Sequence, residues 1–364
     1  MSKKEKVLAF ATLGRDSNEE HRILTLLGAL EPVRFAFDRS RKWAMFRKLL
    51  GEIRKSRPQL VVMEGTGVAG GAALILARLL FGQRYVVSSG DAVGPWVGSR
   101  IRLFGPIFGL YERVLCRLAA GFIGWTPYLV GRALTFGTGR AMTAPGWAPF
   151  AIDESDRQGM RNRTRDALGI PRENIVVGIA GSLIWSRRHA YCYGFELVKA
   201  AQNFGRSDVT VLIVGDGDGR AELERMAGRL PKGRVVFVGR VPQSELPGYY
   251  AAMDVASLPQ SVDGVGSFRY TTKISEYLHF KLPFVTGQIP LAYDLDDAWL
   301  WRLPGNSPWD PRYIDGLANL LAKLDQEAIS RKRNAIPETV TLFDRQTQVF
   351  RTEQFIRDLL ESRE

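Results

Sequence analysis

The feature that most constrains this chain is the alternation, from end to end, of short apolar runs with longer segments of helical periodicity. In the first half the runs are KVLAFATL, VRFAF, QLVVMEG, RYVVSSGD, GFIGWT and RAMTAPG, and in the second NIVVGIAGSL, VTVLIVGDG, RVVFVGRV, DVASLP and LPFVTG. Strands that alternate with helices form parallel sheets covered by those helices. The sequence therefore predicts an α/β fold with two Rossmann-like, doubly wound sheets in tandem.

A polar segment divides the two sets of runs. Residues 147–174 read WAPFAIDESDRQGMRNRTRDALGIPREN and contain few strand formers. Such composition is typical of a domain boundary. We expect an N-terminal domain over 1–155 and a C-terminal domain over 156–340. Residues 341–364 show helical periodicity, and we expect this helix to pack back across both domains.

Composition excludes several classes of protein. With 364 residues and 45% hydrophobic content, the chain can form two packed cores. The longest apolar segment has 14 residues and includes Arg78, so it falls short of the ~20 residues that span a bilayer. Cys116 and Cys192 lack metal-ligand spacing, and no metal site is expected. A reducing cytoplasm is expected.

The net charge of +12 is concentrated in the first half. Residues 1–155 contain 22 Lys and Arg against 12 Asp and Glu, whereas residues 156–364 contain 28 against 26. This asymmetry indicates an anionic partner for the first domain, either nucleic acid or a membrane surface. No nucleic-acid-binding motif accompanies the charge, so we expect an anionic membrane and no nucleic acid.

Ligands of open parallel sheets bind beyond the carboxyl ends of the strands, so the loops there hold the candidate residues. At the end of NIVVGIAGSL, Gly181 allows a close approach of the backbone, and beyond this run Arg187 and Arg188 are expected at the start of a helix. Two guanidinium groups there could bind a pyrophosphate. A solvated basic turn is the equally weighted alternative.

The next two loops carry weaker signals. Gly215, Gly217 and Gly219 favour a tight turn from strand to helix more than a dinucleotide site. Arg240 and Val241 follow RVVFVG and could border a nucleobase. The segment 244–253 is predicted to be a short structural helix with its apolar residues in the core.

The segment RYTTKISEYL combines a helix start with two opposite charges. Apolar spacing predicts a helix that begins near Thr271 or Thr272 and directs Ile274 to the core. Lys273 and Glu276 then share a side of its first turns. A cation at a helix start favours phosphate, and a carboxylate can accept hydrogen bonds from both ribose hydroxyls. Together they suit a nucleoside diphosphate.

Over about residues 175–287 the chain resembles the retaining GT-B glycosyltransferases of the glycogen-synthase-like type, also called group 1 or family 4. The resemblance rests on four segments in order, GSLIWSRRHAYCYGFELVKAA, VTVLIVGDGDGRAELERMA, VVFVGRVPQSELPGYYAAMDVASLP and TTKISEYLHFKLPFVT. In the first half, SSGD and TAPGWAPF match more loosely. The resemblance implies two Rossmann-like domains facing a cleft, the second holding a sugar nucleotide and the first an acceptor.

The resemblance also assigns roles to residues. Arg187 or Arg188 would take the place of the phosphate-binding basic residue, Lys273 that of the lysine before the glutamate, and Glu276 that of the ribose-binding glutamate. We expect Asp91, Arg187 and Lys273 as catalytic residues. The expected nucleotide-binding residues are Gly181, Arg188, Arg240, Val241, Thr272 and Glu276.

Two departures from the family pattern concern the donor. Ser182 stands where the family has arginine after the glycine, and Phe268 stands where a glutamate reads the donor sugar. A metal-independent, retaining transfer is implied, with fixed cations stabilising the leaving nucleotide. No cofactor is expected beyond the co-substrate, a UDP-sugar first and a GDP-sugar second. On the acceptor side, Asp91, Gly14 and Arg15 are the candidates.

Two segments of the first half combine apolar and basic residues. Residues 34–57 carry nine Lys and Arg around an apolar stripe of Trp43, Phe46, Leu50 and Ile53, which we expect to be mainly core. The other reads PWVGSRIRLFGPIFGLYERVL and suits a membrane interface or buried core equally. We expect a cytoplasmic enzyme of polysaccharide biosynthesis, peripheral on the inner face of the membrane, with a lipid-linked or membrane-proximal glycan acceptor. A sugar-nucleotide epimerase or a non-catalytic sugar-nucleotide-binding protein is the alternative.

Overall fold

The structure is a computed structural model and describes residues 7–150 and 154–362. The basic opening, part of the predicted linker and the last two residues lie outside the described residues. The chain forms two compact units. Unit 1 comprises Met1–Trp147, Ser267–Tyr270 and Thr341–Glu364, and unit 2 comprises Ala148–Gly266 and Thr271–Val340. The division lies earlier than the predicted boundary at 155/156, and a short internal segment belongs to unit 1.

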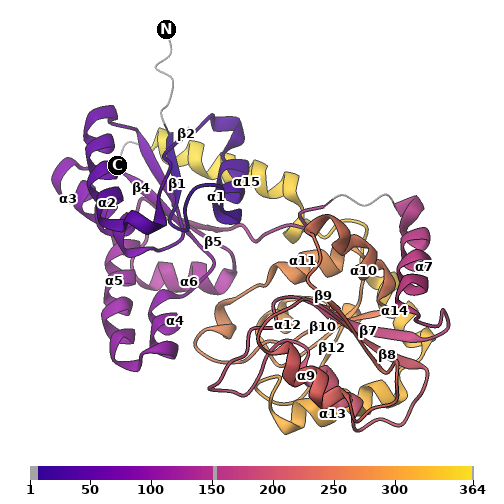
Figure 1. Ribbon diagram of the computed structural model, residues 1–364. Coiled ribbons are helices and arrows are strands. Elements are labelled where there is room, and N and C mark those ends of the chain that lie inside the picture. The colour runs from indigo at the N-terminus through magenta and orange to yellow at the C-terminus, as the bar shows by residue number, and fades with distance from the viewer. Residues whose placement is uncertain (1–6, 151–153, 363–364) are drawn as a thin grey trace. The chain divides into compact units, whose positions relative to one another are not determined.

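Unit 1 is built on a six-stranded parallel sheet with the order β2-β1-β3-β4-β5-β6 (Figure 1). The strands are β1 (Val7–Ala11), β2 (Val33–Arg34), β3 (Leu60–Glu64), β4 (Tyr85–Ser89), β5 (Gly121–Gly124) and β6 (Ala141–Thr143). The central strands are buried on both faces, as their uninterrupted apolar runs require. The order reverses between β1 and β3, where such sheets bind ligands beyond the strand ends.

The helices of unit 1 cover both faces of this sheet. They are α1 (Asn18–Leu26), α2 (Lys42–Ser56), α3 (Val68–Phe81), α4 (Val93–Arg100), α5 (Gly105–Arg117), α6 (Pro127–Thr135) and α15 (Arg345–Glu361). Short 3₁₀ helices are η1 (Gly28–Leu30), η2 (Arg39–Arg41), η3 (Arg102–Phe104) and η8 (Thr341–Phe343). Ser17 caps α1 by accepting from the Glu20 N–H at 3.2 Å. The C-terminal helix α15 lies beside α1 in unit 1 (Figure 1).

The stripe of residues 43–53 is mostly core. Ile53 is buried, and Phe46 and Leu50 pack against the core from α2. Trp43 differs from the prediction, because 71% of it is exposed. The amphipathic pattern therefore places the helix on the sheet and leaves its first turn outside the packed surface.

Unit 2 holds a second six-stranded parallel sheet with the order β12-β11-β10-β7-β8-β9. Its strands are β7 (Ile175–Ala180), β8 (Val209–Val214), β9 (Val235–Gly239), β10 (Val255–Leu258), β11 (Phe284–Thr286) and β12 (Leu300–Arg302). Its helices are α7 (Arg157–Leu168), α8 (Phe195–Ala201), α9 (Arg220–Ala227), α10 (Leu246–Ala252), α11 (Thr272–His279), α12 (Leu291–Asp294), α13 (Pro311–Lys323) and α14 (Gln326–Ala335). Its 3₁₀ helices are η4 (Glu154–Asp156), η5 (Gln243–Glu245), η6 (Gly266–Phe268), which reaches into unit 1, and η7 (Asp297–Trp299). The order reverses between β7 and β10, and doubly wound sheets bind nucleotides beyond the strand ends at such a reversal.

The fold prediction is confirmed. Each of the eleven predicted runs contains a strand, and both sheets are parallel. The prediction missed β12, whose three residues beside β11 carry Trp301 and Arg302 rather than an apolar run. None of the described helices is long and apolar enough to cross a membrane.

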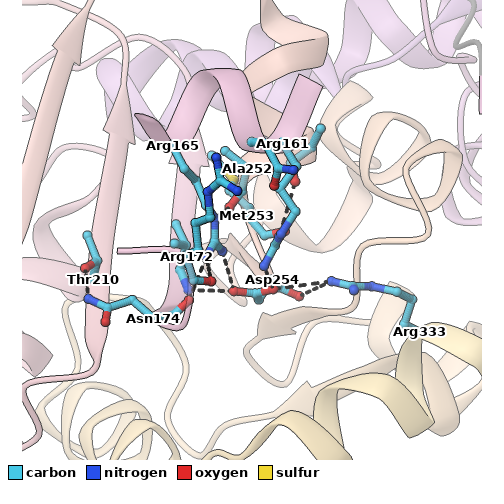
Figure 2. A network of polar contacts seen from close by, with 12 residues as sticks. Arg161, Arg165, Arg172, Asn174, Thr210, Ala252, Met253, Asp254 and Arg333 are labelled. Atoms are coloured by element: carbon cyan, nitrogen blue, oxygen red, sulfur yellow. Dashed lines mark hydrogen bonds and ion pairs between the residues drawn. The ribbon is translucent and has the colours of Figure 1, made fainter. Parts of the chain in front are cut away.

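At the amino end of the unit 2 sheet, a buried carboxylate forms ion pairs with three arginines (Figure 2). Asp254 pairs with Arg165 and Arg161, each at 2.7 Å, and with Arg333 at 3.7 Å. It also accepts a hydrogen bond from the N–H of Val176 on β7. Arg165, 1% exposed, donates further to the carbonyl oxygens of Ala252, Arg172 and Asn174. The network thus joins α7, the end of α10 and the central strands, at the edge opposite the predicted ligand site.

Candidate functional site

A pocket of about 290 Å³ opens at the carboxyl ends of β7, β8 and β9 in unit 2. The described residues that line it are Ala180, Gly181, Ser182, Val214, Gly215, Asp216, Arg240, Val241, Leu246, Tyr250, Thr272, Lys273 and Glu276. They come from five places in the chain, the ends of three strands and the helices α10 and α11. The predicted residues Gly181, Arg240, Val241, Thr272, Lys273 and Glu276 are therefore brought together within one unit.

Two glycines bring the backbones of β7 and β8 close at the floor of this pocket. Gly215 has a φ of +141°, and a Cβ added there would lie 1.8 Å from the carbonyl oxygen of Gly181. No side chain fits at that position. The glycine run after β8 therefore forms a tight turn, as predicted, and its first member also lines the pocket.

Helix α11 supplies two of the four charged residues that line the pocket, and the other two are Asp216 and Arg240. It begins at Thr272 with Thr271 as N-cap, and Ile274, Tyr277 and Leu278 are buried, as predicted. No described side chain accepts a hydrogen bond from its first turn in the manner of a cap. The N–H of Ile274 donates to the carbonyl oxygen of Thr271 at 3.1 Å, so the N–H groups of Thr272 and Lys273 are the ones in this turn that remain available to a ligand.

Lys273 lies over Gly181. Its Nζ is 4.5 Å from the centre of the Tyr193 ring, and a Cβ on Gly181 would come within 3.1 Å of its Cε. The glycine thus leaves the space that the lysine occupies. The ammonium group and the start of α11 give this end of the pocket a positive character.

Glu276 is buried, with 9% exposure, so it is not an ordinary surface glutamate. Its Oε2 accepts a hydrogen bond from the hydroxyl of Tyr250. Burial, and then the charge of the carboxylate, raise the pKa of Tyr250, so the hydroxyl keeps its proton. The carboxylate is therefore held in place by a neutral donor.

The helix predicted over 244–253 as purely structural needs correction. It forms as η5 and α10, but Leu246 and Tyr250 line the pocket. Their apolar spacing indicated a core helix, and Tyr250 is indeed 1% exposed. The hydroxyl of Tyr250 contacts Glu276 on the next helix, α11, and the spacing of apolar residues along the sequence does not predict such a contact.

Arg187 and Arg188 do not stand at a helix start. They lie in an exposed turn closed by the pairing of Ser186 with Tyr191, and α8 begins only at Phe195. Neither is among the described residues that line the pocket. The left-handed Gly194 delays the helix, because its φ of +89° reverses the chain just before α8.

The first turn of α8 carries a buried carboxyl group, that of Glu196, which the sequence did not single out. Glu196 accepts hydrogen bonds from Tyr191 at 3.1 Å and from Ser257 at 2.9 Å. Burial raises the pKa of Glu196 to about 7. Because it is fully enclosed, it supports the loop after β7 rather than lining the pocket.

The acceptor-side candidates lie at the carboxyl edge of the unit 1 sheet. Asp91 follows β4, is half-exposed, and its Oδ1 pairs with Nε of Arg269 at 2.5 Å. Gly14, with a φ of +111°, and Arg15 follow β1. Arg15 is exposed and lies 3.3 Å from Asp16. Both loops thus sit where a ligand of unit 1 would bind.

Sequence reasoning missed a buried ion pair at the same edge. Glu64 ends β3 and binds Arg22 at 2.7 Å and the indole N–H of Trp125 at 3.1 Å. Burial raises the pKa of Glu64, and the charge of Arg22 opposes that rise. An apolar run signalled the strand, but nothing local marked Arg22, which lies on α1, as its partner.

Phe268 and Asp263 occupy the region of the expected sugar-reading glutamate. Phe268 belongs to unit 1, where its carbonyl accepts from Thr126 at 2.9 Å and its ring packs against the core. Asp263 accepts from the N–H groups of Val265 and Gly266, both at 2.8 Å. Burial would raise the pKa of Asp263, but these hydrogen bonds outweigh it and lower the pKa. The carboxylate of Asp263 therefore stabilises the loop that contains it.

Among the described residues, no group of three or more His, Cys, Asp and Glu lies together as a metal site would require. Cys116 and Cys192 are buried and separate, and each is a free thiol.

Comparisons with known proteins agree with this architecture. HepE of Anabaena, solved with UDP and glucose, superposes with a TM-score of 0.66 at 15% identity, over 98% of this chain and 99% of that one. WaaG, a glycosyltransferase involved in lipopolysaccharide biosynthesis, superposes with a TM-score of 0.63 at 12% identity, over 96% and 99%. The fold is GT-B.

The family comparison concerns unit 2 of this GT-B chain. Residues 174–300 match the family model described as Glycosyl transferases group 1. A 2-deoxystreptamine glucosyltransferase of Streptomyces kanamyceticus is 29% identical over 172 residues. That alignment covers 45% of this chain and 43% of the relative, so it spans less than half the length of either. The matched region contains every residue that lines the pocket.

Proposed function

We propose that this chain is a glycosyltransferase that moves a sugar from a nucleoside diphosphate donor to a lipid-linked or membrane-proximal glycan. The observation that carries the proposal is the pocket of unit 2, where Lys273 and Glu276 stand one turn apart on α11 beside the backbone of Gly181. A nucleoside diphosphate offers an anion for the first and vicinal hydroxyls for the second.

The donor would lie with its phosphates at the start of α11 and its ribose at Glu276. Arg240 and Val241, after β9, would border the base. Gly181 and Gly215 both line the pocket, so their backbone would border the bound diphosphate. A UDP-sugar is proposed first, since HepE was solved with UDP, and a GDP-sugar second.

Transfer requires that charge on the departing diphosphate be stabilised. Lys273 and the first-turn N–H groups of α11 are fixed in place before the reaction and would act without a metal. Arg187 and Arg188 would add to them only if their exposed turn approaches the bound phosphates. Retention of anomeric configuration is part of the proposal.

On the acceptor side we propose that Asp91 orients or deprotonates the acceptor hydroxyl, with Gly14 and Arg15 beside it. A membrane-proximal glycan is favoured by the basic first half of the chain. The structural likeness to WaaG, a protein of lipopolysaccharide biosynthesis, is consistent with this class of acceptor. A peripheral enzyme on the cytoplasmic face of the membrane is the corresponding location.

A second function is favoured by one observation, the replacement of the sugar-reading glutamate by Phe268, a side chain that packs into unit 1. A sugar-nucleotide epimerase or a non-catalytic sugar-nucleotide-binding protein would share the pocket but not the transfer.

A two-step experiment separates these functions. Thermal shift of the purified protein is measured with UDP-, GDP-, ADP- and TDP-sugars and with NAD. The protein is then incubated with the stabilising sugar nucleotide and membrane extract. The release of nucleoside diphosphate is measured, and the identity of the sugar in the unreacted sugar nucleotide is analysed. Transfer predicts acceptor-dependent release, an epimerase predicts an isomerised sugar nucleotide without release, and a binding protein predicts neither. Stabilisation by NAD alone would overturn the proposal.

A further inference from the structure

Unit 1 carries a helical hairpin whose tip exposes large apolar side chains. It consists of α4, η3 and α5, and Figure 1 shows α4 lying alongside the first part of α5. Leu103 is 78% exposed, Leu110 63% and Ile107 59%. The other exposed apolar residues of the hairpin are Trp96, Ile101 and Phe104. Six of the 17 large hydrophobic residues that are exposed in the described part of the chain lie in this one hairpin, so their exposure needs an explanation.

The apolar side chains face outward because glycines fill the inner seam of the hairpin. A Cβ on Gly94 would lie 2.9 Å from the Cα of Gly109, and one on Gly98 would lie 3.2 Å from the Cα of Gly105. The two helices therefore approach backbone to backbone. No space remains between them for Leu103 or Ile107 to fold inward.

Polar contacts fix the hairpin to unit 1. The N–H of Gly94 donates to Oε2 of Glu112 at 3.1 Å, and Arg132 of α6 holds the same buried carboxylate with two bonds of 2.9 Å. The hydroxyl of Tyr111 donates to the carbonyl oxygens of Thr66 and Gly67, which follow β3. The tip is thus presented on a fixed support.

The charge of the tip is entirely positive. Between Asp91 and Glu112 the sequence holds no acidic residue, whereas Arg100 and Arg102 are both exposed. The guanidinium group of Arg100 lies 3.7 Å from the centre of the Trp96 ring. Arginine and tryptophan beside exposed aliphatic side chains suit the headgroup region of an anionic bilayer.

We propose that this tip, Trp96–Leu110, inserts into the interface of an anionic lipid bilayer and docks unit 1 on the membrane. The alternative of a second copy is less favourable, because in a two-fold dimer the same patch would face itself and bring like charges together. Binding to lipid requires no such contact, since the phosphates provide the opposite charge.

The position of the tip gives docking a consequence for the proposed acceptor. Tyr111 is level with the loop after β3, so residues 105–110 of α5 extend beyond the carboxyl edge of the sheet. Helix α4 begins two positions after Asp91. A docked tip would therefore hold the acceptor edge of unit 1 close to the bilayer, where the sugar end of a lipid-linked acceptor lies. This consequence rests on the proposed function, whereas the docking itself does not.

Vesicle flotation tests the proposal with the full chain. Vesicles of phosphatidylcholine alone are compared with vesicles that also contain phosphatidylglycerol, at low and high salt. We expect salt-sensitive flotation with the anionic vesicles. Leu103→Ser with Ile107→Ser should weaken it by about tenfold or more, since each removes a large apolar group from lipid. Arg100→Glu with Arg102→Glu should abolish the preference for anionic vesicles.

Leu79→Ser with Leu80→Ser is the matched control, because these leucines of α3 are 66% and 60% exposed and lie outside the hairpin. This control should float as the unmodified protein does. Absence of flotation, or equal flotation of the tip variant, overturns the proposal. A tip variant that changes a dimer to a monomer without affecting flotation assigns the patch to a second copy and also overturns it.

Thermal shift with UDP, measured on the same samples, keeps the two proposals apart. A protein that responds to UDP but does not float contradicts membrane docking alone. A protein that floats but does not respond to any sugar nucleotide contradicts the proposed function alone.

Discussion

The hydroxyl of Tyr250 donates a hydrogen bond to Oε2 of Glu276, joining α10 to α11 at the wall of the unit 2 pocket. Among the described residues none donates to the other oxygen, Oε1. The tyrosine therefore fixes the carboxylate while one oxygen stays available to a ligand. Tyr250 is a positioning residue in this arrangement, and Glu276 is the proposed ribose contact.

Replacing Tyr250 by Phe should weaken UDP binding by roughly tenfold, because a hydrogen bond to a charged group contributes about 1.5–3 kcal/mol. Isothermal titration calorimetry measures the change. Glu276→Gln should weaken binding too, and the double variant should lose less than the sum of the two effects. Tyr249→Phe, on the same helix and half-buried, is the control and should bind normally. Additive losses would show that the two residues act independently.

Lys273→Ala should lower the affinity for UDP by at least about tenfold and leave the affinity for uridine unchanged, because the ammonium group is proposed to meet only the phosphates. Titration of both ligands into each variant checks this. Arg187→Ala and Arg188→Ala test the alternative. Losses smaller than twofold are expected from them, on the order of a surface substitution. A larger loss from either arginine than from Lys273 would mean that the turn closes over the phosphates.

Asp91→Asn should reduce the rate of sugar transfer by about 100-fold or more if its carboxylate acts on the acceptor hydroxyl. UDP affinity should not change, because Asp91 lies in unit 1 and the pocket in unit 2. Its partner Arg269 offers a comparison, since Arg269→Ala frees the carboxylate without removing it. Steady-state rates at saturating donor, measured for both variants, distinguish loss of the Asp91 carboxylate from loss of its ion pair. Full activity of Asp91→Asn would remove the residue from the reaction.

The fold was predictable from local pattern because the central strands of a parallel sheet are buried on both faces and therefore appear as apolar runs. The edge strand β2 is exposed and includes Arg34, and it was found through the apolar residues that follow it in VRFAF. β12 was missed because a three-residue edge strand with Trp301 and Arg302 needs only one neighbour. The position of α11 was equally readable, since its buried face repeats with helical spacing and Thr271 can begin a helix.

The site was predictable only in part, for a physical reason. Thr272, Lys273 and Glu276 are close in sequence, so helix geometry alone brings them together. Tyr250 meets Glu276 across two helices, a tertiary contact that no local pattern encodes. Arg187 and Arg188 were wrongly predicted at a helix start. Ser186 pairs with Tyr191 and encloses them in a turn, and the helix begins only at Phe195.

The buried pair of Arg165 and Asp254 should be a strong determinant of the stability of unit 2 (Figure 2). Arg165→Met should lower the free energy of unfolding by roughly 3–5 kcal/mol. The substitution removes one ion-pair partner of a buried carboxylate and the hydrogen-bond donor of three carbonyl groups. Arg163→Ala is the matched control on the same helix. Its pair with Asp156 is exposed, so the expected change is about 0–1 kcal/mol. Urea unfolding of both variants measures the difference, and similar losses would contradict the proposed weight of the buried pair.

Glu196 should make unit 2 less stable as the pH rises. Its pKa is raised from 4.5 to about 7 in the folded protein, chiefly by burial. The folded state therefore keeps a proton that the unfolded chain has lost, and stability falls from about pH 4.5 until the group ionises near pH 7. The total loss is on the order of 3 kcal/mol, from the size of that shift.

Glu196→Gln removes the titrating group but keeps an acceptor for Ser257. Relative to the unmodified protein, this variant should gain stability progressively between about pH 4.5 and pH 7, and the gain should level off above that range. Unfolding free energies measured on both proteins at a series of pH values give the difference directly, which cancels the contribution of the other titrating groups. A difference that stays constant with pH would mean that Glu196 remains ionised in the folded protein and that Tyr191 and Ser257 hold its charge.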